Sequence, residues 1–380
     1  MKKVLIITDR TLHSAPRVIR TIDALKNEFE LFTVGITPPA FEVAAHYNRK
    51  TIQEGFAYRV LRKINRDYRG KYIPDNYIDK GKLYRIKKIL DAVEPDIVIC
   101  HECFDVPYMA HLKERYQYKL VFNAHEYYPL EFDERPEWAS TWQLFYEDLY
   151  RRFLPAVDLM VNVCDSIREK CLEVFQKDSI VIPNAAHLSE LPAQIPGKII
   201  QLIHHGGAIP SRKIEEMIRM MDILGPGYHL TFMLMPNVPE YYQSLQEMAS
   251  EKSNISFIEP VSFRQIVPTL NLFDIGIYIL PPASFNNAIA LPNKFFEFIQ
   301  AKLCIAIGPS PEMKRLCEKY ELGVVADAFN AESLAQKISG IDVDQLLGYK
   351  RNAEKAAQTL SAEHFGTVFL SAIHDLAVGE

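Results

Sequence analysis

The stretch LPNKFFEFIQA, residues 291–301, predicts a helix with one apolar face and one polar face. Phe295, Phe298 and Ile299 recur at helical spacing and give the apolar face. Asn293 and Glu297 stand four residues apart and therefore share a second face. The stretch thus places two polar side chains on a helix whose apolar face belongs to the core.

The start of this helix lacks a capping side chain. Pro292 is expected in the first turn, because its fixed φ suits that position and its missing N–H would have no partner there. Leu291 precedes it and has no side-chain oxygen, so the first amides need another partner. A phosphate group is one candidate. Solvent at the end of an ordinary buried helix is the other.

Length and composition indicate a globular protein of two domains. The chain has 380 residues, of which 48% are apolar and 24% charged, and one hydrophobic core seldom serves so many residues. No apolar run approaches the ~18 residues of a membrane span. The apolar run Val4–Ile7 after Met1 is too short for a signal peptide and predicts a first strand. We therefore expect a cytoplasmic protein.

The six cysteines are scattered along the chain, which favours reduced thiols over a disulfide framework. Cys100 and Cys103 form a C-x-x-C sequence after an apolar strand, but no second pair of ligands accompanies them. A metal site or a redox role is therefore not expected.

Positive charge is concentrated in residues 59–88, which hold eleven Lys or Arg against three Asp. This segment carries a charge of +8. The rest of the chain therefore carries −13, which gives the net charge of −5. One interpretation is a solvated basic face. The other is a surface that docks at the inner face of the membrane, on anionic lipid head groups, or on an acceptor that carries phosphate. Nucleic acid is not expected as a partner, because no recognition motif accompanies the charge.

Short β-rich runs alternate with amphipathic segments, which is the pattern of βαβ units on parallel sheets. The predicted strands of the first half are 3–8, 29–34, 96–100, 119–123 and 159–163, with helices at 17–26 and 82–93. A linker rich in proline and polar residues, 187–197, precedes strands at 199–204, 230–235, 255–258, 275–280, 304–307 and 324–326. We therefore predict an α/β chain of two Rossmann-like domains, residues 1–188 and 197–362.

Polar side chains follow three strands of the first half. Parallel sheets bind ligands beyond the carboxyl ends of their strands, so these residues are expected to line a substrate cleft. They are Asp9, Arg10, His13 and Arg17 after the first strand, His101 and Glu102 after the third, and His125 and Glu126 after the fourth.

In the second half, Gly206 and Gly207 end a strand, and Ser211 is expected to cap the helix that follows. Arg212 and Lys213 would then lie in the first helical turn, where the helix dipole disfavours cations. Such a conflict is expected where an anion binds; the alternative is that both side chains point into water. The glycine spacing fits neither a dinucleotide fingerprint nor a Walker loop.

Several of these motifs, in this order, resemble the retaining glycosyltransferases of the GT-B fold, and family 4 in particular. They are VIPNA at 181–185, the segment 206–213, FDIG at 273–276 and LPNK at 291–294 with Glu297, together with Pro95-Asp96 and NAHE at 123–126 in the first half. The resemblance covers nearly the whole chain. It implies two facing Rossmann-like domains and a C-terminal helix, about residues 363–380, that crosses back to the first domain.

The resemblance also implies a nucleotide-sugar donor held by the second domain. Glu297 matches the glutamate that grips the ribose hydroxyls, and a carboxylate suits a diol because it can accept both hydrogen bonds. Lys213 matches the lysine that neutralises the diphosphate. Arg212 takes over from an arginine whose usual place is occupied by Ala208. Gly206 and Gly207 would let the backbone approach the donor, and the amides near Asn293 and Lys294 would meet the phosphates.

The first domain would hold the acceptor, a glycan or a lipid-linked glycan. His125 resembles the histidine near the reacting sugar, so His125, Arg212 and Lys213 are the expected catalytic residues. His13, Arg17 and Glu126 are expected on the acceptor side. No cofactor or metal is expected, because the cations would neutralise the leaving diphosphate.

The implied activity is a retaining hexosyltransferase-type reaction in surface polysaccharide biosynthesis. One departure matters: Ile289 stands where the family commonly has a first glutamate, eight residues before Glu297. Asn286 or Asn287 would have to replace it. Two alternatives follow, namely a nucleotide-sugar epimerase of the same fold and a binding or scaffold subunit without activity.

Overall fold

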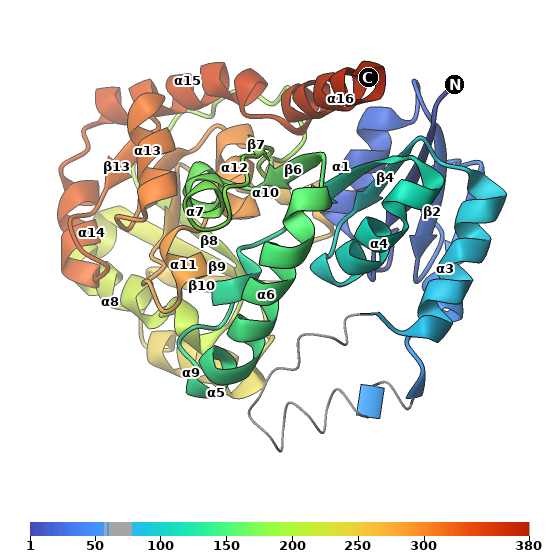
Figure 1. Ribbon diagram of the computed structural model, residues 1–380. Helices are drawn as coiled ribbons and strands as arrows, with labels where there is room; N and C mark the ends of the chain where they lie inside the picture. Colours follow the sequence, from blue (N-terminus) through green and yellow to red (C-terminus); the bar gives the residue numbers. More distant parts are fainter. Residues whose placement is uncertain (57–58, 61–77, 380) are drawn as a thin grey trace. The chain divides into compact units, whose positions relative to one another are not determined.

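The computed structural model describes residues 1–56, 59–60 and 78–379 of the chain. It divides into two compact units (Figure 1). Unit 1 consists of Met1–Pro183, Ser284–Asn286 and Phe365–Glu380, and unit 2 of Asn184–Ala283 and Asn287–His364. Each unit is a parallel sheet with helices around it, which confirms the predicted α/β class.

The sheet of unit 1 has the strand order β3-β2-β1-β4-β5-β6-β7, with every pair parallel. Its strands are β1 Lys3–Ile7, β2 Glu30–Gly35, β3 Ala45–Asn48, β4 Ile97–Cys100, β5 Lys119–Asn123, β6 Leu159–Asn162 and β7 Ile180–Val181. Because β1 lies between β2 and β4, the chain changes its direction of growth there, and this is where open sheets bind ligands.

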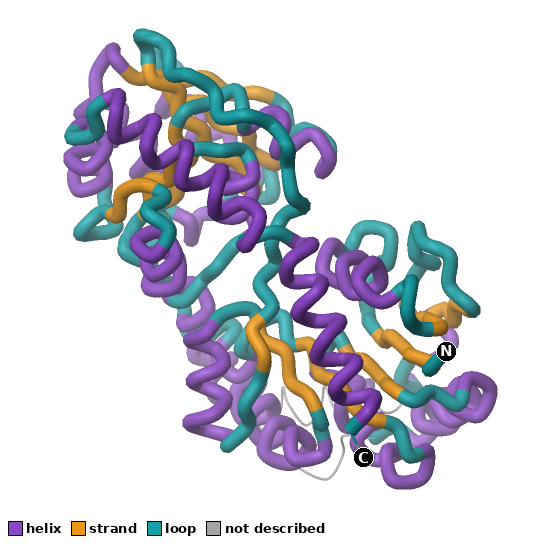
Figure 2. Tube along the Cα trace, turned by 90° about the horizontal axis from the view of Figure 1, so that it is seen from above, coloured by secondary structure: helices purple, strands orange, loops and turns teal. Residues whose placement is uncertain are grey.

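Helices cover the sheet of unit 1 and close its core. They are α1 Pro16–Leu25, α3 Lys80–Val93, α4 Val106–Tyr116, α5 Pro136–Trp138, α6 Leu144–Phe153, α7 Asp165–Phe175 and α16 Ala362–Val378. Phe369 and Ile373 of α16 are buried among core residues of β1, β4 and α1. Figure 2 shows this C-terminal helix beside the strands of the unit that also holds the N-terminus. The predicted return of the C-terminal helix to the first domain is therefore confirmed.

The sheet of unit 2 has the order β10-β9-β8-β11-β12-β13, again parallel throughout. Its strands are β8 Ile200–Gly207, β9 Tyr228–Met235, β10 Ile255–Ile258, β11 Ile275–Tyr278, β12 Cys304–Ile307 and β13 Gly323–Val325. The helices are α8 Glu215–Leu224, α9 Pro239–Ala249, α10 Ile266–Leu270, α12 Asn293–Gln300, α13 Pro311–Lys319, α14 Ala331–Ser339 and α15 Val343–Thr359. The short α11 Phe285–Ala288 is divided between the units after Asn286. The order reverses between β8 and β11.

Two helix starts differ from the prediction. Ser211 does not cap α8: Pro210–Arg212 form a 3₁₀ turn, Lys213 follows at φ 50°, and the helix begins at Glu215. Proline favours this tight turn, and acidic residues suit the positive end of the helix dipole. Arg212 and Lys213 therefore lie before the helix and not in its first turn. Pro292 is the residue before α12, with an extended ψ of 158°, and offers no side-chain cap.

Candidate functional site

The end of β8 in unit 2 brings backbone close to polar side chains. Gly206 has φ 121°, and a Cβ there would lie 3.2 Å from the Lys294 Nζ. A Cβ on Gly207 would lie 2.2 Å from the Asn237 Oδ1. Both glycines are therefore needed for this close approach. The Arg212 guanidinium donates a hydrogen bond to the Gly207 carbonyl at 3.0 Å, so it lies over the same turn.

Lys294, in the first turn of α12, is a buried cation without a hydrogen-bond partner in the described part of the chain. It is 6% exposed, and its Nζ lies 3.9 Å from the centroid of the Tyr278 ring. Burial, and then the positive charge of Arg212, lowers its pKa well below the ordinary value, while Glu297 acts in the opposite direction. A bound anion would therefore stabilise the charged form of this amino group.

Glu297 lies one turn further along α12. Its Oε2 is 3.3 Å from the Nε2 of His205, and both side chains are buried. Burial, followed by the charges of Lys294 and Arg212, lowers the pKa of His205 to about 3, so the imidazole is neutral at pH 7. The corner thus combines an ammonium, a guanidinium and a carboxylate. Such a set can bind an anion next to a pair of hydroxyls.

The side chains of Lys213 and Asn293 make contacts outside this corner. The Lys213 side chain is 57% exposed, and its Nζ lies 3.8 Å from Glu215. The Asn293 Oδ1 accepts a hydrogen bond from the Asn184 amide. Of the donor-side residues expected from the sequence, the structure brings together Gly206, Gly207, Arg212, Lys294 and Glu297.

Sequence reasoning missed three residues of this corner. His205, Asn237 and Tyr278 follow or end strands β8, β9 and β11. The rule that ligands lie beyond strand ends would have selected them, as it did in the first half. The ammonium of Lys294 was also missed, because the sequence indicated only its backbone amide as a phosphate contact.

In unit 1, two histidines meet at the ends of β4 and β5. The Nδ1 of His101 lies 3.2 Å from the Nε2 of His125, and the Nδ1 of His125 lies 3.8 Å from Glu102. Glu102 in turn accepts hydrogen bonds from the Arg10 Nε at 3.0 Å and from the Tyr128 hydroxyl at 2.8 Å. This network fixes the orientation of the His125 ring.

Both imidazoles are neutral at pH 7. Burial and the nearby Arg17 lower the pKa of His101 to about 3, and the same causes lower the pKa of His125 well below its ordinary value. His125 can therefore hold a hydroxyl by hydrogen bonding without adding positive charge. Tyr128 was not selected from the sequence, whereas Arg10 and Glu102 were.

The expected acceptor-side residues differ in their surroundings. Arg17 donates to the Ile182 carbonyl at 3.1 Å and lies near the histidines. His13 is exposed, and its Nδ1 pairs with the Thr37 hydroxyl at 2.9 Å. Glu126 is exposed. The structure thus brings Arg17 to the histidine pair and leaves the other two at the surface.

The position of the absent glutamate is filled by a buried apolar residue, since Ile289 is 9% exposed. The Asn286 amide donates to the Tyr127 carbonyl and accepts from its N–H, both at 3.2 Å. Asn286 is a member of unit 1 and is occupied in this way, so it does not replace the carboxylate. Asn287 is the remaining candidate of the two.

Further observations bear on metals, thiols and membranes. In the described ranges, no group of three or more His, Cys, Asp or Glu is arranged to hold a metal ion. The single Asp-x-Asp sequence of the chain, 342–344, begins α15, where Asp342 forms a capping box. All six cysteines are free and buried.

Most of the basic segment, 61–77, lies outside the described residues. No described helix is long and apolar enough to cross a membrane.

Comparisons with known proteins agree with this architecture. The profile of Glycosyltransferase Family 4 matches residues 17–190. No curated protein sequence matches the chain. Similar solved structures include sucrose-phosphate synthase from Thermosynechococcus elongatus, with a TM-score of 0.73, 13% identity and full coverage of both chains. A glycosyltransferase from Rickettsia africae has a TM-score of 0.71, 13% identity and coverage of 100% and 99%.

Anabaena HepE, in complex with UDP and glucose, has a TM-score of 0.67 and 12% identity, with 99% of this chain and 100% of that chain covered. The chain therefore has the GT-B fold. The resemblance that the sequence motifs indicated is confirmed at the level of the fold, and the family-4 profile matches the first half of the chain.

Proposed function

We propose that the chain is a retaining hexosyltransferase of surface polysaccharide biosynthesis. It transfers a sugar from a nucleotide diphosphate, of which UDP is the first candidate, to a glycan or lipid-linked acceptor. The family-4 match and the similarity to HepE, which was solved with UDP and glucose, support a nucleotide-sugar donor. The donor would bind unit 2 and the acceptor unit 1.

One observation carries this proposal. Lys294 is a buried ammonium without a hydrogen-bond partner in the described part of the chain, and it stands beside Arg212, a glycine turn and Glu297. A diphosphate would supply the missing charge, and the ribose hydroxyls would donate to Glu297. Both requirements are met by one ligand class, the nucleoside diphosphates.

The same groups would assist the reaction. When the bond between the sugar and the diphosphate breaks, negative charge grows on the leaving diphosphate, so Arg212 and Lys294 bind it more strongly than they bind the intact donor. Lys213, on the exposed turn after Arg212, would have to turn from Glu215 toward the diphosphate to add a third cation. His125, neutral and fixed by Glu102 and His101, would hold a sugar hydroxyl during transfer.

A thermal-shift screen tests donor binding. UDP, GDP, ADP and their glucose conjugates are added to the full-length protein, and we expect one base to raise the melting temperature, because a ligand that binds only the folded state stabilises it. Glu297→Ala should abolish most of the shift, whereas the exposed Glu240→Ala should keep it. No shift with any nucleotide would overturn the proposal.

A turnover assay separates the alternatives. With the donor alone, a transferase should show only slow hydrolysis, whereas an epimerase would convert the donor to its epimer. Donor binding without turnover, in the presence of lipid-linked oligosaccharides from cells, would identify a binding subunit. Ile289 is the residue that favours this last outcome, because the carboxylate expected there is absent.

A further inference from the structure

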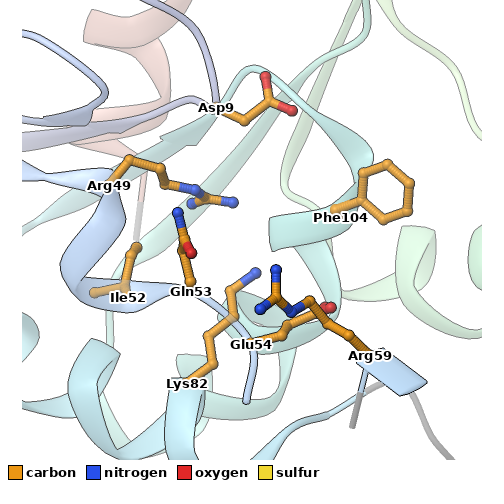
Figure 3. Close-up of a pocket in the computed structure, with 8 residues that line it drawn as sticks. All are labelled: Asp9, Arg49, Ile52, Gln53, Glu54, Arg59, Lys82 and Phe104. Carbon is orange, nitrogen blue, oxygen red and sulfur yellow. The ribbon is translucent and has the colours of Figure 1, made fainter. Parts of the chain in front are cut away.

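Unit 1 contains a pocket of about 210 Å³ that the donor proposal does not use (Figure 3). Its lining includes Asp9 after β1, Arg49 after β3 and Phe104 after β4, together with Gln53 and Lys82. The pocket therefore lies beyond the carboxyl ends of the strands, where the strand order reverses between β1 and β4. This is the place where open parallel sheets bind ligands.

Two cationic side chains that line the pocket are held in place by ion pairs. Figure 3 shows the Arg49 guanidinium and the Lys82 ammonium pointing toward its middle. The buried Asp105 lies 2.8 Å from the Arg49 Nη1 and 3.0 Å from the Lys82 Nζ. Burial would raise the pKa of the Asp105 carboxyl, but the two cations hold it below its ordinary value. The carboxylate thus locks both cations in place.

The charges of the pocket balance. Asp9 and Glu54 line it with the three cations Arg49, Lys82 and Arg59, and the third carboxylate, Asp105, pairs with two of these cations. Arg10, which lies 3.4 Å from Asp9, is itself paired with Glu102 and adds no net charge. A phosphate or a carboxylate would therefore find no excess positive charge. A neutral ligand with several hydroxyls would find both donors and acceptors, because Gln53 adds an amide that offers each.

One wall is an aromatic ring in a rigid setting. The Phe104 ring centroid lies 6.2 Å from that of Trp142, 6.1 Å from that of Phe145 and 5.8 Å from that of Tyr146. Contacts of this kind hold the ring in one orientation. Phe104 is therefore a ready apolar surface on one side of a cavity that charged side chains also line. A pyranose ring has the matching character, with apolar C–H faces and polar hydroxyls at its rim.

The size limits the ligand further. Pockets that enclose a drug-sized molecule measure roughly 300–1,000 Å³, so a cavity of about 210 Å³ suits a single ring. We propose that this pocket binds one uncharged hexopyranose residue of the acceptor. Phe104 lies against a face of the ring, and Arg49, Gln53 and Asp9 hold its hydroxyls. This inference rests on the proposed transferase function, because it assigns the acceptor end of the same reaction.

Saturation-transfer NMR on the full-length protein tests the pocket. The probes are the methyl α- and β-pyranosides of glucose, galactose and mannose, with methyl β-glucuronide and inorganic phosphate for comparison. UDP is present in every sample. We expect at least one neutral glycoside to bind, and Phe104→Ala to weaken its Kd about three- to tenfold. Gln53→Ala should weaken the same Kd and serves as a second variant if Phe104→Ala does not fold.

The matched control is Phe263→Ala, at a half-exposed phenylalanine of unit 2, which should leave the Kd of the glycoside unchanged. The pocket proposal is overturned if no neutral glycoside binds, if both pocket variants bind as tightly as the wild type, or if glucuronide or phosphate is preferred. These failures differ from failure of the donor proposal, which is measured by the UDP thermal shift alone.

Discussion

Lys294 meets two opposing demands. In the free protein, its ammonium is buried beside Arg212 without a hydrogen-bond acceptor among the described residues, which destabilises the fold. In the donor complex that we propose, the same group would pair with a diphosphate in a site of low dielectric, where a charged hydrogen bond is strong. Residues that cost stability in this way are expected at functional sites.

Lys294→Met separates the two demands, because methionine fills a similar volume without a polar atom. We expect the free protein to gain about 1–3 kcal/mol, the typical cost of an unsatisfied buried polar group. The affinity for UDP should fall roughly 10- to 100-fold, as expected when a hydrogen bond to a charged group is lost. Urea unfolding and calorimetric titration measure both quantities. The exposed Lys213→Met is the stability control, and a less stable Lys294→Met with unchanged UDP affinity would contradict this role.

Two buried histidines make stability depend on pH. His101 in unit 1 and His205 in unit 2 each have a pKa of about 3, because burial disfavours the charged imidazolium. An unfolded histidine binds its proton near pH 6.5. Between these values the unfolded state holds more protons, so stability falls as the pH drops, by about 2 kcal/mol per histidine from pH 7.5 to pH 5.

Urea unfolding at pH 7.5, 6 and 5 measures this slope for the wild type, His101→Gln and His205→Gln. Each variant should lose one histidine's share of the pH dependence, whatever its absolute stability. His111→Gln, at an exposed position, is the control and should keep the wild-type slope. Equal slopes in all four proteins would show that the two imidazoles are not held neutral by burial.

At the residue scale, the sequence predicted identities better than orientations. Glu297, Arg212 and the two glycines were selected from spacing and resemblance, and the structure places them at one corner of unit 2. The exposure of Lys213 was not predictable, because its own backbone has φ 50°, and this left-handed conformation breaks the expected helix start. The pairing of Asn286 with Tyr127 joins positions 159 apart, and no local pattern indicates such a contact.

At the scale of elements, the position of α12 depends on a single glycine of β11. A Cβ on Gly276 would lie 2.5 Å from the Phe298 ring, which is fully buried and also meets His205 with centroids 5.5 Å apart. The absence of this Cβ lets α12 pack directly on the strand. Because α12 also carries Lys294 and Glu297, the same contact sets the geometry of the candidate donor site.

Gly276→Ala should therefore disturb both the fold and donor binding. We expect a loss of about 1–3 kcal/mol, as in other overpacked cores, and weaker UDP binding. Phe298→Leu opens space at the same contact, so the double variant should lose less stability than the sum of the single variants. Gly348→Ala, in open space on α15, is the control and should be neutral or slightly stabilising. Strictly additive losses would contradict a direct contact.

The sequence located most strands within one or two residues, because buried parallel strands are continuous apolar runs. Two strands were not predicted, because their runs are short or polar. β3, Ala45–Asn48, is only partly buried, and β7 has two residues, so neither gives a clear periodic signal. The start of α8 was misplaced for another reason: Ser211 suits a cap, but Pro210 begins a turn that delays the helix to Glu215.

At the scale of the whole molecule, unit 1 is assembled from distant parts of the chain. Its core includes Phe369 and Ile373, which are more than 180 residues from the end of its main segment. The His374 ring lies 5.0 Å from the Phe29 ring, and the Lys2 ammonium donates to the Ala377 carbonyl. The resemblance to the GT-B fold indicated this return of the chain, whereas periodicity alone could show only that a helix occurs there.

The stability of unit 1 should therefore depend on the last helix. Phe369→Ala removes a side chain that is 3% exposed, and we expect a loss of about 3–5 kcal/mol. The substitution leaves a cavity in the core of unit 1. Amides of β1 and β4 should therefore lose protection in hydrogen exchange, while β8 and β9 of unit 2 keep theirs. Val368→Ala, one residue away and 39% exposed, should change stability by less than about 0.5 kcal/mol. If the amides of β8 and β9 exchanged before those of β1 and β4 in Phe369→Ala, α16 would stabilise unit 2 and not unit 1.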